Sequence, residues 1–294
     1  MDVATGNLIV SNSSLSLRGV TGDVAISQTY NLMGAPIGST TVPAAKNWTV
    51  GIDGLGYLSQ GTGTVVYTTG DGATWSFTPV GGSSTAFTSP AGFKSDLVAS
   101  ATNYTLTNRI SRQVVTFNLD GQPTSIADRN GNTTTVGYTY ANPTSVTSSA
   151  GPMAARTASL AYNSSTFTLT VSQASGSLSR NIKYVKDASS NLVSIVDALG
   201  KTTSFTYSGT KMTTITAPTG QVTTFTYGST GKVEKVAQAN TSAGSPGTST
   251  TRISYATGTQ TLVAGPNTDQ ALAISVVPRT TYIFDAGTRL VSSV

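Results

Sequence analysis

Alternation of apolar and polar residues predicts β-strands, and one such pattern occurs twice in close succession. Lys201–Tyr207 and Gln221–Tyr227 place Phe and Tyr on one face, with Thr and Ser mostly on the other. This period of two is typical of a strand with one buried face. Glycine precedes each strand, at Gly200 and Gly220. Because glycine adopts positive φ at little cost, these positions indicate turns, and the stretch predicts two β-hairpins.

The same hairpin unit recurs along the chain. Leu192 and Ile195 are matched 20 residues later by Met212 and Ile215. Since a single hairpin is only marginally stable, neighbouring units are expected to stack and bury a common face. The candidate structural residues are the tyrosines that end successive units (Tyr138, Tyr162, Tyr184, Tyr207, Tyr227, Tyr255 and Tyr282), the turn glycines (Gly131, Gly151, Gly200 and Gly220), the core residues Phe205 and Phe225, and the turn residues Asp128 and Asp197.

Short strands separated by glycine turns predict an all-β chain. Between Gly51 and Asp120, runs such as Thr64–Thr69 and Thr74–Thr78 are separated by Asp-Gly and Gly-Gly pairs, which favour hairpin turns. We therefore expect an N-terminal β-meander over residues 1–112 and antiparallel β-hairpin repeats over residues 113–294, in a curled or spiralling sheet.

Two further stretches carry specific expectations. Trp48, the larger of the aromatic side chains near the N-terminus, is predicted to anchor the first core layer, because a large aromatic residue in an apolar surrounding is most often buried. Ala237–Thr251 is rich in Ser, Gly and Thr and lacks alternation. It is predicted to be an extended hairpin loop, since the repeat pattern resumes at Arg252–Tyr255.

Composition narrows the classes of partner. The chain has 17 Lys and Arg against 12 Asp and Glu, and the resulting charge of +5 is spread over 294 residues without a basic run. Nucleic-acid binding is therefore not expected. No apolar run reaches the roughly 18 residues that a membrane-spanning helix requires, so no membrane span is expected either.

The sequence contains neither His nor Cys, which removes the commonest general base, metal ligand and thiol nucleophile. A carboxylate pair, a Ser–Lys dyad or an N-terminal nucleophile would remain as catalytic options. However, Asp71, Asp120, Asp128, Asp197 and Asp285 stand beside or near glycine, where the side chain caps backbone N–H groups. We therefore expect no enzymatic activity, no cofactor and no metal.

Several motifs resemble the RHS/YD-repeat family. Tyr227–Val233 is similar to the family signature Tyr-Asp-x-x-Gly-Arg-Leu, with Gly, Lys and Val in place of Asp, Arg and Leu, and Phe284–Leu290 is a second degenerate copy. Val3–Leu8 resembles the phrase that opens the first sheet of many bacterial RHS proteins. Asp128–Asn132 and Asp197–Lys201 resemble the Asp-x-x-Gly turn between repeats.

The resemblance implies a non-enzymatic role. In RHS/YD proteins, which include polymorphic toxins and teneurins, hairpins spiral into a hollow β-shell. This chain would then be a structural segment of an exported protein, extracellular or at the cell surface. Its partners would be missing C-terminal repeats of a larger parent chain. The self-cleaving aspartyl peptidase and the toxin of the family have no counterpart here, so no catalytic residue is carried over.

Two alternatives remain open from the sequence. Strands at Asn7–Val10 and Arg289–Val294 carry few charges and no Pro, and unguarded strand edges recruit other strands. The chain would then pair with itself, head to tail, as a self-assembling extracellular filament or surface-layer subunit. Thr- and Asn-rich strand faces with Tyr and Trp are also compatible with a secreted glycan-binding or carbohydrate-acting module.

Overall fold

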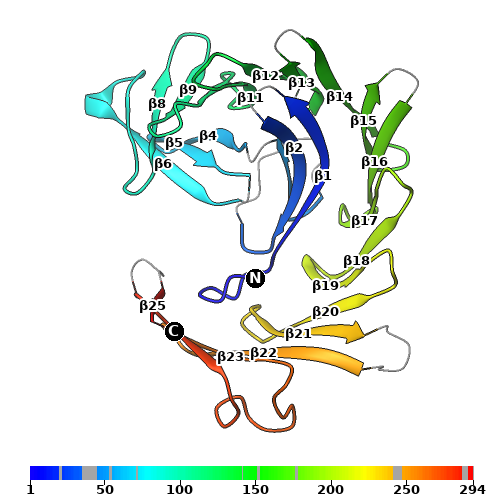
Figure 1. Ribbon diagram of the computed structural model, residues 1–294. Coiled ribbons are helices and arrows are strands. Elements are labelled where there is room, and N and C mark those ends of the chain that lie inside the picture. The colour runs from blue at the N-terminus through cyan, green and yellow to red at the C-terminus, as the bar shows by residue number, and fades with distance from the viewer. Residues whose placement is uncertain are drawn as a thin grey trace. The chain divides into compact units, whose positions relative to one another are not determined.

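The protein is all-β, as predicted. The computed structural model describes residues 1–19, 22–34, 45–52, 55–70, 72–140, 142–150, 153–175, 178–240, 247–286 and 291–293. These residues form 25 β-strands, together with one 3-10 turn, η1 (Val80–Gly82) (Figure 1). All strand pairings between the described strands whose registers are defined are antiparallel.

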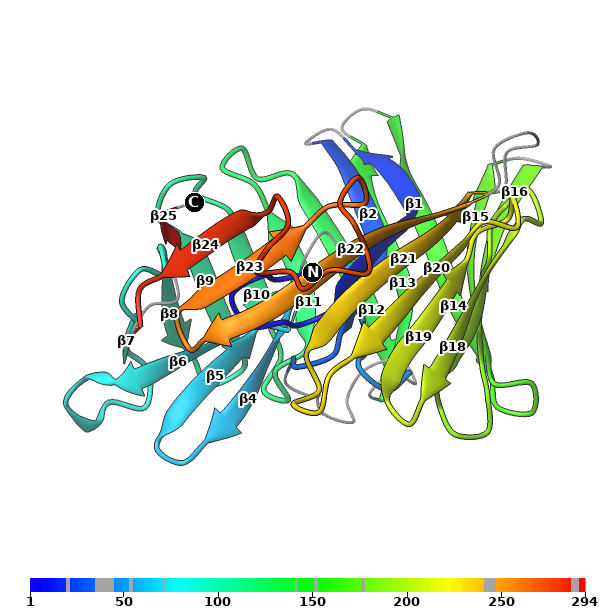
Figure 2. The same ribbon diagram turned by 90° about the horizontal axis from the view of Figure 1, so that it is seen from below.

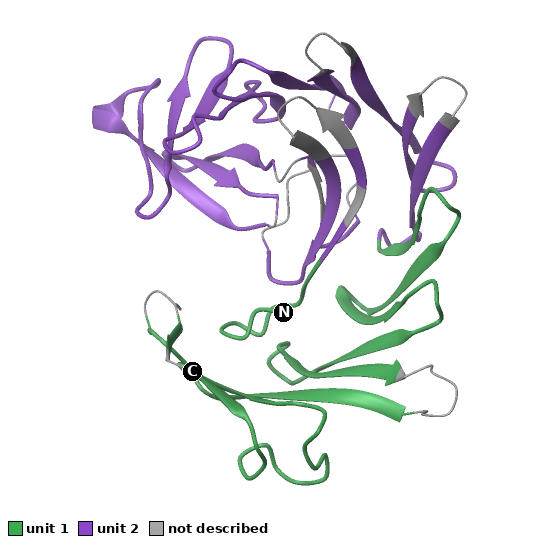
Figure 3. Ribbon diagram, viewed as in Figure 1, with its two compact units in different colours: residues 1–10, 191–294 green, residues 11–190 purple. Residues whose placement is uncertain are grey.

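The chain divides into two compact units (Figure 3). Unit 1 consists of Met1–Val10 and Asn191–Val294, and unit 2 of Ser11–Ser190. The boundary therefore lies within the region of hairpin repeats, whereas the sequence pattern placed a division at residues 112 and 113. The first ten residues join the C-terminal part of the chain, which no local pattern indicates.

Unit 2 contains three sheets, in which β1–β3, β4–β7 and β8–β16 each follow chain order. Its strands are β1 (Ile9–Gly19, whose first two residues belong to unit 1), β2 (Gly22–Asn31), β3 (Trp48–Ile52), β4 (Tyr57–Gly61), β5 (Thr64–Thr68), β6 (Thr74–Pro79), β7 (Phe87–Thr88), β8 (Ser95–Ala99), β9 (Tyr104–Asn108), β10 (Val114–Phe117), β11 (Pro123–Ala127), β12 (Thr133–Thr139), β13 (Asn142–Ala150), β14 (Met153–Asn163), β15 (Thr168–Ser175) and β16 (Leu178–Lys186).

The core of unit 2 is aromatic. Trp48 is buried and its ring lies 5.6 Å from that of Tyr30, which confirms its predicted place in a core layer. On the neighbouring sheet, Tyr67 and Phe77 are buried, and the ring of Tyr67 meets that of Phe117 edge-on at 6.0 Å. The backbone N–H of Leu58 on β4 donates to the carbonyl of Gly121 (2.9 Å). This hydrogen bond ties the β4–β7 sheet to the turn after β10.

Unit 1 is a meander of nine strands that pair in chain order, and Figure 2 shows the middle strands side by side. They are β17 (Leu192–Val196), β18 (Thr202–Ser208), β19 (Lys211–Thr216), β20 (Val222–Tyr227), β21 (Val233–Asn240), β22 (Gly247–Thr257), β23 (Gln260–Ala264), β24 (Thr280–Phe284) and β25 (Val291–Ser293). Phe205 and Phe225 are buried, as their alternation predicts. Tyr207 and Tyr227 are only half-buried.

A β-bulge explains this difference between Phe and Tyr. The register shifts between Thr206 and Tyr207, so that Tyr207 pairs with Met212, and the same shift makes Tyr227 pair with Val233. The extra residue opposite each tyrosine twists the strand end locally. The tyrosines therefore depart from the strict alternation of buried and exposed side chains that the sequence pattern indicated.

The loop predicted over residues 237–251 is largely strand. Lys235–Asn240 pairs with Gly247–Arg252 in a continuous antiparallel register, while residues 241–246 lie outside the described part of the chain. The stretch is a hairpin, as expected, but its strands extend much further than predicted. Polar residues with β-branched side chains, such as Thr250 and Thr251, sustain strand pairing without apolar alternation.

Candidate functional site

Five turns whose residues are all described share one hydrogen-bonding pattern and fix hairpins of both units; Thr69 and Gly72 make the same two hydrogen bonds between β5 and β6. The first residue of each donates its N–H to the carbonyl of the fifth, and the fourth, always glycine, donates to the carbonyl of the first, at 2.8–3.1 Å. These glycines have φ between +76° and +84°, a region that other residues adopt only at a cost. The turns are Asn118–Gln122, Asp128–Asn132, Asp197–Lys201, Ala217–Gln221 and Gly228–Lys232.

The turn aspartates cap the backbone, as predicted for Asp128 and Asp197. Asp128 Oδ1 accepts the N–H groups of Asn130 and Asn132, both at 2.9 Å. Asp197 Oδ1 accepts those of Leu199 (2.9 Å) and Lys201 (2.8 Å). Their carboxylates are thus engaged in turn geometry. Gly131, Gly200 and Gly220 occupy the positive-φ position of these turns, and Gly151 lies outside the described residues.

Four of the candidate tyrosines form a repeated contact, which we call the tyrosine latch. In each, the tyrosine hydroxyl near the end of the second strand of a hairpin donates to the carbonyl of the first or second residue of the first strand. In the first three, the latch therefore closes the hairpin at the end opposite its glycine turn. The pairs are Tyr138 with Pro123 (2.9 Å), Tyr207 with Leu192 (2.7 Å), Tyr227 with Met212 (2.6 Å) and Tyr255 with Val233 (2.7 Å).

Three of the four latches share one spacing, which the sequence pattern did not reveal. Donor and acceptor are 15 residues apart in the first three latches and 22 in the fourth, where the β21–β22 hairpin is longer. The acceptor is a backbone carbonyl, which leaves no mark of its own in the sequence. A usable signal is present in the first strand, where buried residues stand three apart, as in Pro123 and Ile126, because of the bulge in the β10–β11 pairing.

A lysine covers the ring in two latches. Lys211 Nζ lies 5.6 Å from the centroid of the Tyr227 ring, and Lys232 Nζ lies 4.6 Å from that of Tyr255. Each lysine directly precedes the residue whose carbonyl accepts the hydroxyl, so it is placed over the ring by the latch itself. A cation over an aromatic face is attracted by the ring quadrupole. The basic residue of the Gly-Lys-Val segment at Gly231–Val233 thus has a packing role.

The other candidate tyrosines lie in different surroundings. Tyr184 is buried, whereas Tyr162 is 36% exposed and carries Lys186 Nζ at 5.1 Å from its ring centroid. Burial lowers the pKa of Lys186. Tyr282 stacks on Phe284, with ring centroids 6.5 Å apart and 13° between the ring planes. The tyrosines therefore do not form one uniform row of equivalent contacts.

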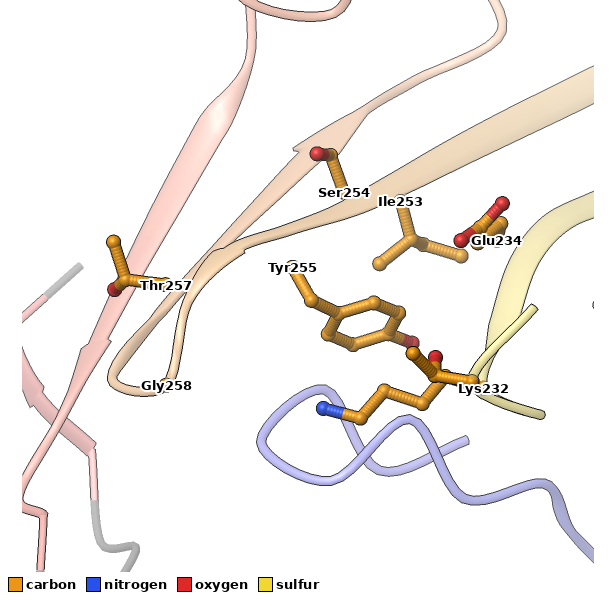
Figure 4. Close-up of a pocket in the computed structure, with 8 residues that line it drawn as sticks. Lys232, Glu234, Ile253, Ser254, Tyr255, Thr257 and Gly258 are labelled. Carbon is orange, nitrogen blue, oxygen red and sulfur yellow. The ribbon is translucent and has the colours of Figure 1, made fainter. Parts of the chain in front are cut away.

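A hollow of about 560 Å³ lies beside the fourth latch in unit 1 (Figure 4). Lys232 and Glu234 are its charged residues. Glu234 forms no ion pair with Lys232 or Lys235; within the described residues the one ion pair joins Arg109 to Asp96. The hollow is lined by Thr230, Lys232, Glu234, Ile253, Ser254, Tyr255, Thr257 and Gly258.

Arg252 organises a long connection that the sequence pattern did not single out. Its guanidinium donates to the backbone carbonyls of Asp269 (2.8 Å), Gln270 (3.2 Å) and Leu272 (2.5 Å). One side chain on β22 thereby holds the segment between β23 and β24. Charge-assisted hydrogen bonds of this kind are stronger than neutral ones, so Arg252 is a structural residue.

The described part of the chain contains neither an acidic metal-binding cluster nor a membrane-spanning helix. There, no group of three or more Asp or Glu residues is arranged to hold a metal ion. Across the same residues, no helix is long and apolar enough to cross a membrane.

Comparison with known proteins gives distant structural similarities only. No protein-family model matches the sequence, and no curated protein matches it. The chain is similar to a porin-like protein from Bacteroides uniformis, at 12% identity and a TM-score of 0.32, over 66% of this chain and 92% of that one. It is also similar to TcdB2-TccC3 without its hypervariable C-terminal region (11% identity, TM-score 0.35, 92% of this chain and 18% of that one).

A third similarity is to the Tc holotoxin pore of Photorhabdus luminescens, at 12% identity and a TM-score of 0.34, over 81% of this chain and 16% of that one. The chain thus spans less than a fifth of the length of the two toxin chains that it matches. Similarities at these TM-scores assign neither a family nor an activity.

The tyrosine latch can be tested with one hydroxyl. Replacing Tyr227 with Phe is expected to lower the free energy of unfolding by about 1–3 kcal/mol, because the Met212 carbonyl loses its donor in a partly buried site. Tyr140→Phe is the matched control, since Tyr140 is 94% exposed and the change should stay within about 0.5 kcal/mol. Equal urea midpoints for the two variants would contradict the latch.

The fourth latch predicts a loss of stability at high pH. Burial, and then the charges of Glu234 and Asp2, raise the pKa of Tyr255 from 10.0 to about 12. The folded state therefore favours the neutral hydroxyl. This contribution is complete below the unfolded pKa and is lost as pH rises from 10.0 through about 12. Urea unfolding across this range should show a steeper decline for the native chain than for Tyr255→Phe, whereas parallel declines would refute the assignment.

Proposed function

We propose that the chain is a non-enzymatic structural segment of an exported RHS/YD-repeat protein, in which latched hairpins form part of a β-shell wall. The observation that carries the proposal is the tyrosine latch, which recurs at Tyr138, Tyr207, Tyr227 and Tyr255. In this role the chain would lie outside the cell or at its surface. Its partners would be further repeats of the same parent chain or other copies of it.

The use of polar side chains supports a structural role. Asp128 and Asp197 cap turns, Lys211 and Lys232 cover tyrosine rings, and Arg252 holds a loop. Each of these groups would be a candidate for chemistry in an enzyme, where it would need to face a substrate. Here each stabilises a turn, a hairpin or a loop of the chain, as the wall of a shell requires.

A repeat deletion tests the proposal. Removing residues 208–227, one 20-residue unit, joins Tyr207 directly to Gly228, so that Tyr207 takes the place of Tyr227 before the Gly228–Lys232 turn. Hairpins of a repeat wall depend mainly on their neighbours, so the shortened chain should remain folded. If instead each hairpin contributed residues to a specific binding site, the same deletion would abolish folding or ligand binding.

The control deletion has equal length but is out of register. Removing residues 218–237 takes away all of β20 and much of β21, including Val233, the acceptor for Tyr255. This chain should lose cooperative unfolding in circular dichroism. Failure of the in-register chain to fold would overturn the proposal, and so would specific binding of the intact chain to a glycan array.

A further inference from the structure

The N-terminal segment, residues 1–8, is held by the β-strands of unit 1 (Figure 3). The carbonyl of Gly6 accepts the N–H of Val233 (3.1 Å), and the carbonyl of Val3 accepts the hydroxyl of Thr261 (2.9 Å). Asn7 and Leu8 are buried. The backbone of this N-terminal segment thus binds to the first residues of β21 and β23, which lie more than 200 residues away in sequence.

The seated segment is a small loop closed by its own hydrogen bonds. The N–H of Asp2 donates to the carbonyl of Asn7, and the N–H of Gly6 donates to the carbonyl of Asp2, both at 2.9 Å. Asp2 Oδ1 also accepts the N–H of Ala4 (2.9 Å). A ligand that holds its bound shape by itself loses less conformational entropy when it binds.

The surface around Gly6 leaves no room for a side chain at that position. A Cβ at this position would lie 2.6 Å from Lys232 Cβ and 2.7 Å from the Tyr255 hydroxyl, and φ is +78°. Figure 4 shows the N-terminal segment, in faint blue, beside Lys232. The latch between Tyr255 and Val233, with Lys232 over the ring, fixes the wall that excludes a side chain. The surface therefore discriminates glycine from every other residue here.

We propose that this surface, formed by Lys232, Val233, Tyr255 and Thr261, is a peptide-binding site that also accepts the N-terminal segment of a second copy of the chain. A second copy carries the ligand that the surface already fits, residue for residue. Residues 1–10 belong to unit 1, and beyond Val10 the chain continues into unit 2. Exchange of such an element between identical chains is a low-cost route to dimers. The site does not depend on the proposed wall function.

A synthetic peptide of residues 1–10 (MDVATGNLIV), labelled at its C-terminus, tests the site. In the Gly6→Val chain the internal segment should no longer fit, leaving the surface open. Fluorescence anisotropy should show the peptide binding this variant at least about tenfold more tightly than the native chain, whose tethered segment competes at a high effective concentration. A peptide with Gly6→Val should not bind either chain.

Gly220→Val is the matched control chain. Gly220 lies in the same unit with φ +84° and has no atom near an added Cβ, so it has the same backbone strain without the contact. It should bind the peptide no better than the native chain does. Equal binding of the native and Gly6→Val peptides, or no binding to a folded Gly6→Val chain, would overturn the proposal.

Capture of the native chain by an immobilised variant tests whether the segment of a second copy binds to this surface. An immobilised Gly6→Val chain should retain the native chain but not untagged Gly6→Val, because only the native chain offers a fitting segment. Peptide binding without this capture would overturn the second copy as occupant. If Gly6→Val does not fold, Gly6→Ala replaces it. Unfolding of both variants would overturn the proposal as well, since exchange requires a receptor that stays folded without its segment.

Discussion

Replacing Phe225 with alanine is expected to lower the free energy of unfolding by about 3–5 kcal/mol. Phe225 is 8% exposed and stands opposite Val236 in the β20–β21 pairing. Removing the ring leaves a cavity beside β20, a strand fixed at its start by the Ala217–Gln221 turn and at its end by the latch of Tyr227. Because these constraints oppose collapse, the cost should fall at the upper part of the range for large-to-small substitutions.

The exposed neighbour provides the control for Phe225. Thr226 lies on the same strand and faces solvent, so Thr226→Ala should change stability by no more than about 0.5 kcal/mol. Both Trp residues lie in unit 2, so their fluorescence does not report on β20 and β21 in unit 1. Hydrogen exchange of the backbone amides of these two strands is therefore the appropriate local measurement. A loss below about 1 kcal/mol for Phe225→Ala would show that this face does not form a packed layer.

Local patterns predicted the local structure. Alternation located strands such as Val222–Tyr227, and the turn glycines and aspartates were identified because positive φ and backbone capping are properties of single residues. The burial of Trp48 and Phe205 followed from side-chain size and face alone. These features depend on interactions within about five residues, which a sequence displays directly.

Contacts through the backbone or between distant segments were not predictable in this way. The tyrosine latch uses a main-chain carbonyl as acceptor, so any residue type could occupy that position. The bulge opposite Tyr207 adds one residue without a composition signal of its own. The seating of Gly6 on Lys232 and Tyr255 joins residues more than 220 positions apart, where no periodicity applies. The binding surface therefore emerged only from the three-dimensional arrangement.

Replacing Gly121 with alanine is expected to have a large effect for so small a substitution. Its φ is +81°, and a Cβ there would lie 1.9 Å from the carbonyl oxygen of Leu58, a backbone atom that no side-chain rotation can move. The same glycine accepts the N–H of Leu58 (2.9 Å). Gly121→Ala should therefore separate β4 from the turn after β10 and lower the free energy of unfolding by more than about 4 kcal/mol, the range of exceptional single substitutions.

Gly131 offers a close internal comparison. It occupies the same position of the same type of turn, with φ +82°, but no atom lies within 4 Å of its added Cβ. Gly131→Ala should cost only the left-handed conformation itself, about 1–2 kcal/mol. Urea unfolding followed by the fluorescence of Trp48 and Trp75, both in unit 2, measures the two variants under one probe. Similar losses would mean that positive φ dominates at both sites and that the Leu58 contact contributes little to holding the β4–β7 sheet.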